Sequence, residues 1–353
     1  MTEYLEFYRG KRVLVTGHTG FKGAWLCRIL EHLGADVLGY ALPPPTSPSL
    51  FDLLKSTSKT NTVLGDICDF EHLYATFSGF EPEIVLHLAA QPLVREGYRA
   101  PRGTFATNVQ GTVNVLECVR KCATVRSFLN VTTDKVYLNR EWEWGYRENE
   151  RLCGLDPYSS SKSCSELVTY CYKHSFLAPR GVAVSTARAG NVIGGGDFAP
   201  DRIVPDCVRA ALNGVPIVLR NPGATRPYQH VLEPLFAYLL IAAKGWENSE
   251  CADAYNVGPG EGDCVTNAAL AELFAHAWGQ GLRWQAGGEN GPREATYLKL
   301  DSSKIRQRLG WRPRLSIAEA VSLTVAWSRV YAEGGDVAGM IDKQILDYIK
   351  TIN

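Results

Sequence analysis

A glycine-rich turn lies between the first strand-like run of the chain and its first helical segment. Residues 12–16 form a largely apolar run typical of a buried strand, and residues 21–33 have the pattern of a helix. Between them, glycine recurs at every third position, at Gly17, Gly20 and Gly23. In a strand–turn–helix unit such glycines permit the tight turn, the approach of backbone to a pyrophosphate and close helix–strand packing. The segment therefore predicts a dinucleotide-binding unit, with phosphates at the positive end of a helix.

The alternation of strand-like and helical segments continues through the first half of the chain. Further strands are expected at residues 36–42, 62–64, 84–88, 125–131 and 182–187, mostly separated by helices such as 103–121 and 158–176. Strands that alternate with helices favour a parallel sheet covered by helices on both faces, joined by right-handed crossovers. The predicted fold class is α/β, with a doubly wound parallel Rossmann-type sheet.

The second half of the chain is richer in glycine and proline and predicts a smaller C-terminal substrate domain interleaved with the first. Residues 254–257, which end at Gly258, are expected to return a last strand to the main sheet. We expect a dinucleotide-binding domain formed by residues 1–190 and 222–258, and a substrate domain formed by residues 191–221 and 259–353.

Composition excludes several classes of function. Among the 353 residues, 37 Lys and Arg balance 37 Asp and Glu, so bulk charge gives no reason to expect nucleic acid or an acidic membrane as partner. The ten cysteines form no Cys-x-x-Cys and lack neighbouring histidines at zinc-ligand spacing, so no metal is expected. The first residues are charged rather than apolar, and no apolar run is long enough to span a bilayer. These features predict a cytoplasmic protein.

A tyrosine and a lysine four residues apart open one of the expected helices. Tyr158 and Lys162 share a helix face, because residues i and i+4 lie one above the other. An ammonium near a phenol favours the phenolate, so we expect Lys162 to lower the pKa of Tyr158 and let it act as a base. The pair follows the glycine turn by about 140 residues, and Thr133 stands at the end of the strand before it.

These features together resemble the extended short-chain dehydrogenase/reductase family, in which the glycine spacing is Gly-x-x-Gly-x-x-Gly. More specifically, six segments resemble the CDP-glucose 4,6-dehydratase family: residues 17–23, 90–95, 133–135, 139–150, 188–197 and 226–231. The resemblance runs from about Arg12 to about Trp327. It departs at Tyr228, where the family usually has tryptophan, and at Val136 and Leu138.

The resemblance implies NAD as cofactor. It assigns cofactor binding to the glycine turn, to a pair that contacts the adenine, to a segment along the phosphates and riboses, and to the tyrosine and lysine: Gly17, His18, Thr19, Gly20, Phe21, Lys22 and Gly23; Asp66 and Ile67; Leu88, Ala89 and Ala90; Tyr158 and Lys162. No ribose-binding acid, and no arginine for a 2′-phosphate, stands in residues 40–43 at the end of the second strand. We therefore expect NAD rather than NADP.

The resemblance also implies a reaction. Tyr158 and Thr133, with Lys162, would assist oxidation at C4 of glucose, because a base takes the O–H proton while the hydride passes to the nicotinamide. Lys135 would then remove the C5 proton, Asp134 would protonate the departing C6 hydroxyl, and the hydride would return to C6. The product is CDP-4-keto-6-deoxyglucose plus water. These roles need a lowered pKa at Lys135 and a raised one at Asp134.

A nucleotide-sugar substrate brings two negative phosphates, which guanidinium groups bind well. Candidate substrate residues are Gln91, Asn191, Arg202, Arg220, Arg226, Arg293 and Tyr297. The tryptophans at 142 and 144 can line the pocket or pin a loop. The resemblance further implies a homodimer or homotetramer, in which the helices at 103–121 and 158–176 pair across a two-fold axis.

Three alternatives remain open. A nucleotide-sugar 4-epimerase or decarboxylase shares the fold and the Tyr158–Lys162 pair, although Asp134 and Lys135 argue against it because epimerisation expels no hydroxyl. The same dehydration can act on a dTDP- or GDP-linked sugar. A non-catalytic NAD(P)-sensing regulator belongs to a different class, and such proteins typically lack the tyrosine–lysine pair.

Overall fold

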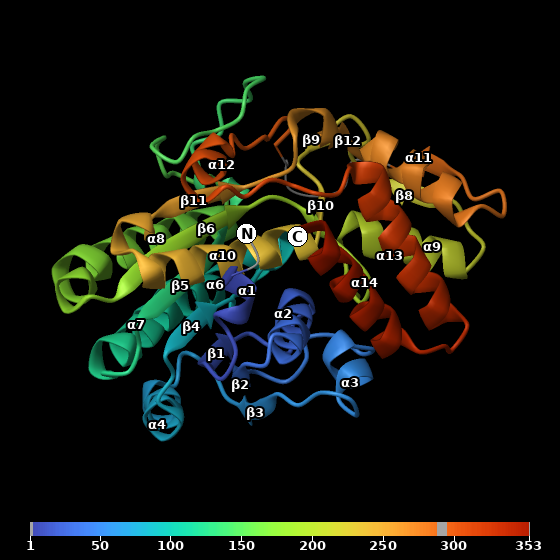
Figure 1. The fold of residues 1–353 in the computed structure, drawn as a ribbon. Coiled ribbons are helices and arrows are strands. Elements are labelled where there is room, and N and C mark those ends of the chain that lie inside the picture. Colours follow the sequence, from blue (N-terminus) through green and yellow to red (C-terminus); the bar gives the residue numbers. More distant parts are fainter. Residues whose placement is uncertain (1–2, 288–294, 353) are drawn as a thin grey trace.

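The computed structural model describes residues 3–287 and 295–352. Its centre is a seven-stranded parallel sheet with the order β11-β6-β5-β4-β1-β2-β3 (Figure 1). The strands are β1 (Arg12–Thr16), β2 (Asp36–Ala41), β3 (Asn61–Leu64), β4 (Ile84–His87), β5 (Ser127–Thr133), β6 (Ala183–Ala189) and β11 (Ala254–Val257). The chain order reverses on either side of β1, which confirms the predicted doubly wound Rossmann-type fold.

Helices cover both faces of the sheet, which explains why the strands are apolar on both sides. One face packs against α1 (Glu3–Glu6), α2 (Phe21–His32), α3 (Leu50–Leu54), α10 (Leu232–Glu247) and α14 (Val337–Ile352). Figure 1 shows α2 and α3 beside α14, although they come from opposite ends of the chain. Helix α10 is buried along almost its whole length. Among residues 3–287 and 295–352, no helix combines the length and apolarity needed to cross a membrane.

The opposite face packs against α4 (Phe70–Phe80), α7 (Gly111–Lys121) and α8 (Pro157–Tyr172). Two expected helices are longer and less regular than predicted. Helices α5 (Val94–Arg99) and α6 (Pro101–Phe105) lead through a π-helical turn, Ala106–Gln110, into α7. Helix α8 likewise continues through a π-helical turn, Lys173–Leu177, and a 3₁₀ turn, Ala178–Arg180. Pro157 occupies the first turn of α8, where its missing N–H costs nothing, and Asp156 caps the helix.

A smaller group of elements has its own apolar core. It contains three short two-stranded sheets, β7 (Val192–Ile193) with β10 (Gln229–His230), β9 (Thr225–Arg226) with β12 (Val265–Thr266), and β8 (Ile217–Leu219) with β13 (Trp284–Ala286). Around them pack α9 (Ile203–Leu212), α11 (Asn267–Trp278) and α13 (Ile317–Ala332). The 3₁₀ turns Asp134–Val136, Ser249–Cys251 and Glu261–Asp263 and the helix α12 (Ser303–Leu309) complete the described elements.

The chain leaves the main sheet after β6 and returns to it at β11. Strand β11 pairs in parallel with β6, with Ala254 opposite Thr186, which confirms the predicted returning strand. The C-terminal segment also contacts the main sheet. Trp311 and the apolar side of α14 pack into the core of the main sheet, because α14 presents Ile341 and Ile345 to that core.

Candidate active site

The carboxyl ends of the central strands meet at one edge of the sheet, and most of the expected site residues follow them. β1 runs into the glycine turn, β4 into residues 88–91, and β5 into residues 133–135. In a doubly wound sheet, ligands bind in the crevice beside the point where the strand order reverses. Here that point lies between β1 and β4.

The glycine turn is shaped to admit a phosphate backbone. Gly17 has a φ of 77°, and a Cβ there would lie 2.7 Å from the backbone nitrogen of Ala89. A Cβ on Gly23 would lie 2.2 Å from the Gly17 carbonyl oxygen, so helix α2 packs tightly on the turn. At Gly20 a Cβ would meet only that same oxygen among the described residues, at 3.4 Å, which leaves this backbone open to a ligand. The helix start carries no side-chain cap, so the residues present fit a dinucleotide diphosphate.

Of two larger side chains of the turn, His18 is buried and Lys22 is half-buried. The His18 ring lies near Thr62, with 3.2 Å between Nε2 and Oγ1, and burial lowers its pKa to about 4. Burial, together with the nearby charges of Lys162 and Arg202, lowers the pKa of Lys22 to about 7. A bound anion would therefore help to keep Lys22 protonated.

The other expected cofactor segments lie at the same edge of the sheet. Ile67 packs against α7, where a Cβ on Gly111 would lie 2.5 Å from its Cδ1 atom. Asp66 accepts a hydrogen bond at 2.9 Å from the backbone N–H of Cys68. The Ala89 N–H donates to Thr16 Oγ1 at 3.2 Å, which ties the end of β4 to the end of β1.

Tyr158, Lys162 and Thr133 come together beneath this edge and are all buried. Lys162 Nζ donates to the Val131 carbonyl at 3.1 Å. Burial raises the pKa of Tyr158 to about 12, although its hydrogen bond with Thr133 and the charge of Arg202 oppose the rise. The pKa of Tyr158 is therefore raised rather than lowered as expected, because desolvation of the phenol outweighs the charge of Arg202.

An acid and an amine follow Thr133 directly. Thr133 Oγ1 donates to Asp134 Oδ1 at 2.9 Å, and Lys135 Nζ lies 3.3 Å from the same oxygen. Asp134 is buried, whereas about a third of the Lys135 side chain is exposed, at 30%. The second oxygen, Asp134 Oδ2, is buried and has no hydrogen-bond partner among residues 3–287 and 295–352. The geometry thus provides a carboxyl group with a free oxygen beside an amine and a hydroxyl, a set able to transfer protons.

Arginines gather on two aspartates near the site. Arg202 donates a hydrogen bond to Asp197 at 2.8 Å, and its positive charge acts to lower the pKa of Tyr158. Arg220 donates to Asp201 Oδ1 at 2.6 Å, and Arg95 of α5 lies 3.6 Å from the same oxygen. Sequence reasoning missed Arg95 as a site residue, although it ends the segment 90–95 that carried the resemblance.

Arg226 is buried, instead of lying exposed where it could bind a phosphate directly. Its buried guanidinium donates to the backbone carbonyls of Thr225 at 2.9 Å and of Ala295. It therefore holds the segment that contains Tyr297. The Glu141 carboxylate holds the same segment by accepting the N–H of Tyr297 at 2.7 Å, a contact that sequence reasoning also missed.

The remaining expected substrate residues are spread around the crevice. Asn191 Oδ1 is buried and lacks a hydrogen-bond partner within the described parts of the chain. The Gln91 side chain donates to Thr104 at 2.8 Å and accepts from the Leu93 N–H at 2.6 Å. Arg293 lies outside the described residues.

The sequence of this chain is similar to those of known proteins. The chain matches the family model described as GDP-mannose 4,6 dehydratase over residues 14–324, which is most of its length. The chain belongs to this family. The CDP-glucose 4,6-dehydratase of Salmonella typhimurium is 46% identical to it over 97% of both chains. The dTDP-glucose 4,6-dehydratase of Streptomyces antibioticus is 30% identical over 90% of this chain and 92% of the relative.

Solved structures share the fold of this family member. A UDP-glucose 4-epimerase from Thermotoga maritima, solved with UDP-glucose, superposes with a TM-score of 0.79 at 25% identity and covers 91% of this chain and 99% of its own. A dTDP-glucose 4,6-dehydratase from Bacillus anthracis, solved in complex with NAD, gives a TM-score of 0.76 at 22% identity over 92% and 99%. Dehydratases and epimerases thus share one architecture, and side chains must distinguish them.

Proposed function

We propose that the chain is an NAD-dependent CDP-glucose 4,6-dehydratase, a hydro-lyase that converts CDP-glucose to CDP-4-keto-6-deoxyglucose and water. The observation that carries this proposal is the 46% identity to a CDP-glucose 4,6-dehydratase over 97% of both chains. The placement of Asp134 and Lys135, 3.3 Å apart and directly after Thr133, supports it, because dehydration needs an acid and a base.

The glycine turn and the ends of β3 and β4 would hold NAD. When bound, this cofactor supplies the acceptor for the C4 hydride and later the donor for C6. Tyr158 takes the proton of the C4 hydroxyl, and Thr133 hydrogen-bonds the same oxygen. Lys162, when charged, favours the phenolate form of Tyr158.

Lys135 and Asp134 carry out the elimination step. A ketone at C4 acidifies the C5 proton, which the neutral amine of Lys135 removes. The C6–O bond breaks as Asp134 gives its proton to the departing hydroxyl, so that water leaves and a C5–C6 double bond forms. The hydride would then add to C6, and Lys135 would return its proton to C5, which restores the amine. The proton that Tyr158 took from the C4 hydroxyl would replace, directly or through water, the one that Asp134 gave to the departing hydroxyl, so that both groups are ready for the next cycle.

The substrate would bind with its diphosphate toward the arginines that gather near Asp197 and Asp201. We assign this contact to Arg202 and Arg220, with Arg95 added from the geometry, and to the amide N–H group of Asn191. Gln91, Arg226, Arg293 and Tyr297 complete the proposed substrate set. Arg226 acts in it by holding the segment before Tyr297.

We further propose two domains, an assembly and a location. The main sheet would form the dinucleotide-binding domain and the smaller core the nucleotide-sugar-binding domain. A homodimer, or a homotetramer built from it, would cover large apolar side chains that α6, α8 and the turn after α8 leave exposed: Phe105, Leu167, Tyr170 and Phe176. All ten cysteines are unpaired, which suits a reducing compartment such as the cytoplasm.

The test is turnover of purified protein with NAD and, in parallel, CDP-, dTDP-, GDP- and UDP-linked glucose or mannose. We expect a 4-keto product that absorbs in alkali from CDP-glucose, and weaker binding of NADP than of NAD. Product from dTDP-glucose alone would overturn the nucleotide assignment, and a C4 epimer without a ketone would favour the epimerase. No reaction with any nucleotide-sugar would favour the sensing regulator.

A further inference from the structure

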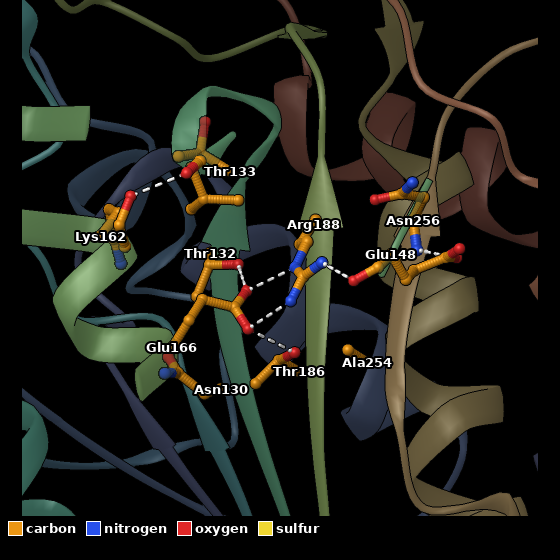
Figure 2. A network of polar contacts seen from close by, with 12 residues as sticks. Asn130, Thr132, Thr133, Glu148, Lys162, Glu166, Thr186, Arg188, Ala254 and Asn256 are labelled. Carbon is orange, nitrogen blue, oxygen red and sulfur yellow. Dashed lines mark hydrogen bonds and ion pairs between the residues drawn. The ribbon is translucent and has the colours of Figure 1, made fainter. Parts of the chain in front are cut away.

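A buried ion pair joins the helix that carries Tyr158 and Lys162 to strand β6. Arg188 Nε lies 2.9 Å from Glu166 Oε1, and Arg188 Nη2 lies 3.0 Å from Glu166 Oε2, so the pair is bidentate (Figure 2). Only 4% of the Arg188 side chain and 3% of the Glu166 side chain are exposed. A buried ion pair is weak evidence for a role in stability, because well-packed apolar side chains often stabilise such a site as well.

The Glu166 carboxylate is fully satisfied as an anion. Thr132 Oγ1 donates to Oε1 at 2.5 Å and Thr186 Oγ1 donates to Oε2 at 2.9 Å, in addition to the two bonds from Arg188. These donors hold the pKa of Glu166 below its usual range although burial opposes them. The carboxylate therefore stays ionised in the interior.

Glu166 stands one helical turn beyond Lys162, as Lys162 stands one turn beyond Tyr158. Residues spaced by four lie on one face of α8, so the phenol, the ammonium and the carboxylate form one column. Figure 2 shows Lys162 and Glu166 on the same side of this helix, facing β5 and β6. The acceptor of the Lys162 ammonium is an uncharged carbonyl, that of Val131.

The groups around Lys162 mostly disfavour its charge. Lys22 from α2 is a like charge, His87 from β4 is buried and neutral, and burial itself lowers the pKa of Lys162 to about 8. Tyr158 and Glu166 face it from its own helix, and the Glu166 charge raises the pKa of Lys162.

We propose that Glu166 is a positioning residue that keeps the buried Lys162 side chain charged, and that Arg188 holds the Glu166 carboxylate in place for this task. The inference rests on the proposed function, because the charged lysine matters through Tyr158. Arg188 is itself fixed, since its Nη1 donates to Tyr137 Oη at 2.8 Å and to the Glu148 carbonyl at 2.9 Å. Arg188 therefore keeps the Glu166 carboxylate on the same helix face as Lys162 when substrate and cofactor bind.

The test compares the pH profile of kcat in wild type and Glu166→Gln. The amide keeps the size of the side chain and an acceptor oxygen but carries no charge, so Lys162 should lose its proton at lower pH. We expect kcat to fall at alkaline pH as Lys162 loses its proton, and we expect this fall to move down by about one pH unit in Glu166→Gln. Glu166→Asp, which keeps the charge, should restore the profile toward wild type.

The matched control is Arg188→Lys. It loses the planar fork of the guanidinium but leaves the Glu166 carboxylate and a cation, so it lowers stability without moving the alkaline limb. If Glu166→Gln does not fold because Arg188 is left unpaired, the double variant Glu166→Gln with Arg188→Met removes both charges. It should still move the alkaline limb downward, but by less, because the repulsion from Arg188 is lost together with the attraction to Glu166.

A second readout needs neither substrate nor cofactor. The Cε resonance of Lys162 in lysine-labelled protein, assigned by its loss in Lys162→Met, should titrate at lower pH in Glu166→Gln than in wild type. An unchanged Lys162 titration, or an equal shift in Arg188→Lys, would overturn the proposal. Absence of dehydratase activity in wild type would overturn the proposed function, while this titration would still decide the role of Glu166.

Discussion

Gly17 and Ala89 approach so closely that a single Cβ on Gly17 would lie 2.7 Å from the Ala89 backbone nitrogen. This contact joins the carboxyl end of β1 to the carboxyl end of β4, the two strands between which the chain order reverses. The floor of the proposed NAD site is therefore made of backbone, and substitutions there test the site directly.

Gly17→Ala should weaken both folding and NAD binding. The alanine must adopt a left-handed φ of 77°, which is strained for a residue with a Cβ, and this Cβ also displaces the backbone of Ala89. Gly181→Ala is a matched control, because Gly181 has a φ of 76° and no described atom within 4 Å of its Cβ position. We expect Gly181→Ala to cost about 1–2 kcal/mol in urea unfolding, and Gly17→Ala to cost more and to bind NAD more weakly. Equal costs and equal NAD affinity would contradict the close approach.

Lys135→Ala should separate oxidation from elimination. The variant keeps Tyr158 and Thr133, so the 4-keto sugar and reduced cofactor should accumulate, while 6-deoxy product should fall by about 10²-fold or more. Lys135→Arg, which keeps a long basic side chain but stays protonated near neutral pH and so cannot serve as a base, should stall in the same way. Wild-type turnover in Lys135→Ala, measured by cofactor absorbance and product analysis, would remove Lys135 from the mechanism.

Glu233→Gln should make stability less dependent on pH. Burial raises the pKa of Glu233 from 4.5 to about 7, although Tyr348 and the Arg314 N–H donate to its carboxyl oxygens at 2.8 Å. Between these pH values the folded chain holds a proton that the unfolded chain has lost, so its stability falls as pH rises. This loss amounts to about 3 kcal/mol at most.

The glutamine variant cannot titrate, and its amide can still accept the Arg314 N–H and donate to the Tyr348 oxygen. Its unfolding free energy should therefore stay flatter from pH 4.5 to about 7 and exceed that of wild type above this range. Glu250→Gln, at an exposed position, is the control and should follow wild type. A steeper pH dependence in Glu233→Gln would show that the carboxyl group is not held protonated by burial.

Leu167→Glu should split the proposed dimer without unfolding the chain. Leu167 is 56% exposed on α8, beside the apolar Tyr170, so a charge there opposes burial against a second copy. Leu346→Glu, at a position 47% exposed on α14, should leave the assembly intact. Sedimentation at micromolar concentration distinguishes the two. A monomeric wild type would end the dimer proposal.

The sheet could be predicted closely because its determinants are local. Apolar runs bounded by glycine or polar residues predicted β1 through β6, and the run before Gly258 predicted the return of β11. The glycine turn was predictable for the same reason, since its spacing alone implies close backbone contacts.

Properties that depend on three-dimensional surroundings were harder to predict. The pKa of Tyr158 is raised rather than lowered, because sequence spacing shows its neighbour Lys162 but not its depth of burial. Arg226 faces backbone carbonyls of a segment about seventy residues away, a partner that no spacing reveals. Glu166 could have been found from its four-residue spacing beyond Lys162, but its partner Arg188 comes from a different strand.

The late return of β11 bears on how the nascent chain folds. Strand β6 is complete at Ala189, yet the neighbour that protects its outer edge is not synthesised until Val257. During this interval the growing sheet presents an unpaired edge, the feature by which strands of different molecules associate. Helix α10, which covers β5 and β6, also emerges in this interval and just before β11. Chains truncated between β6 and β11 should therefore aggregate after release from the ribosome, whereas chains that extend past β11 can complete the sheet.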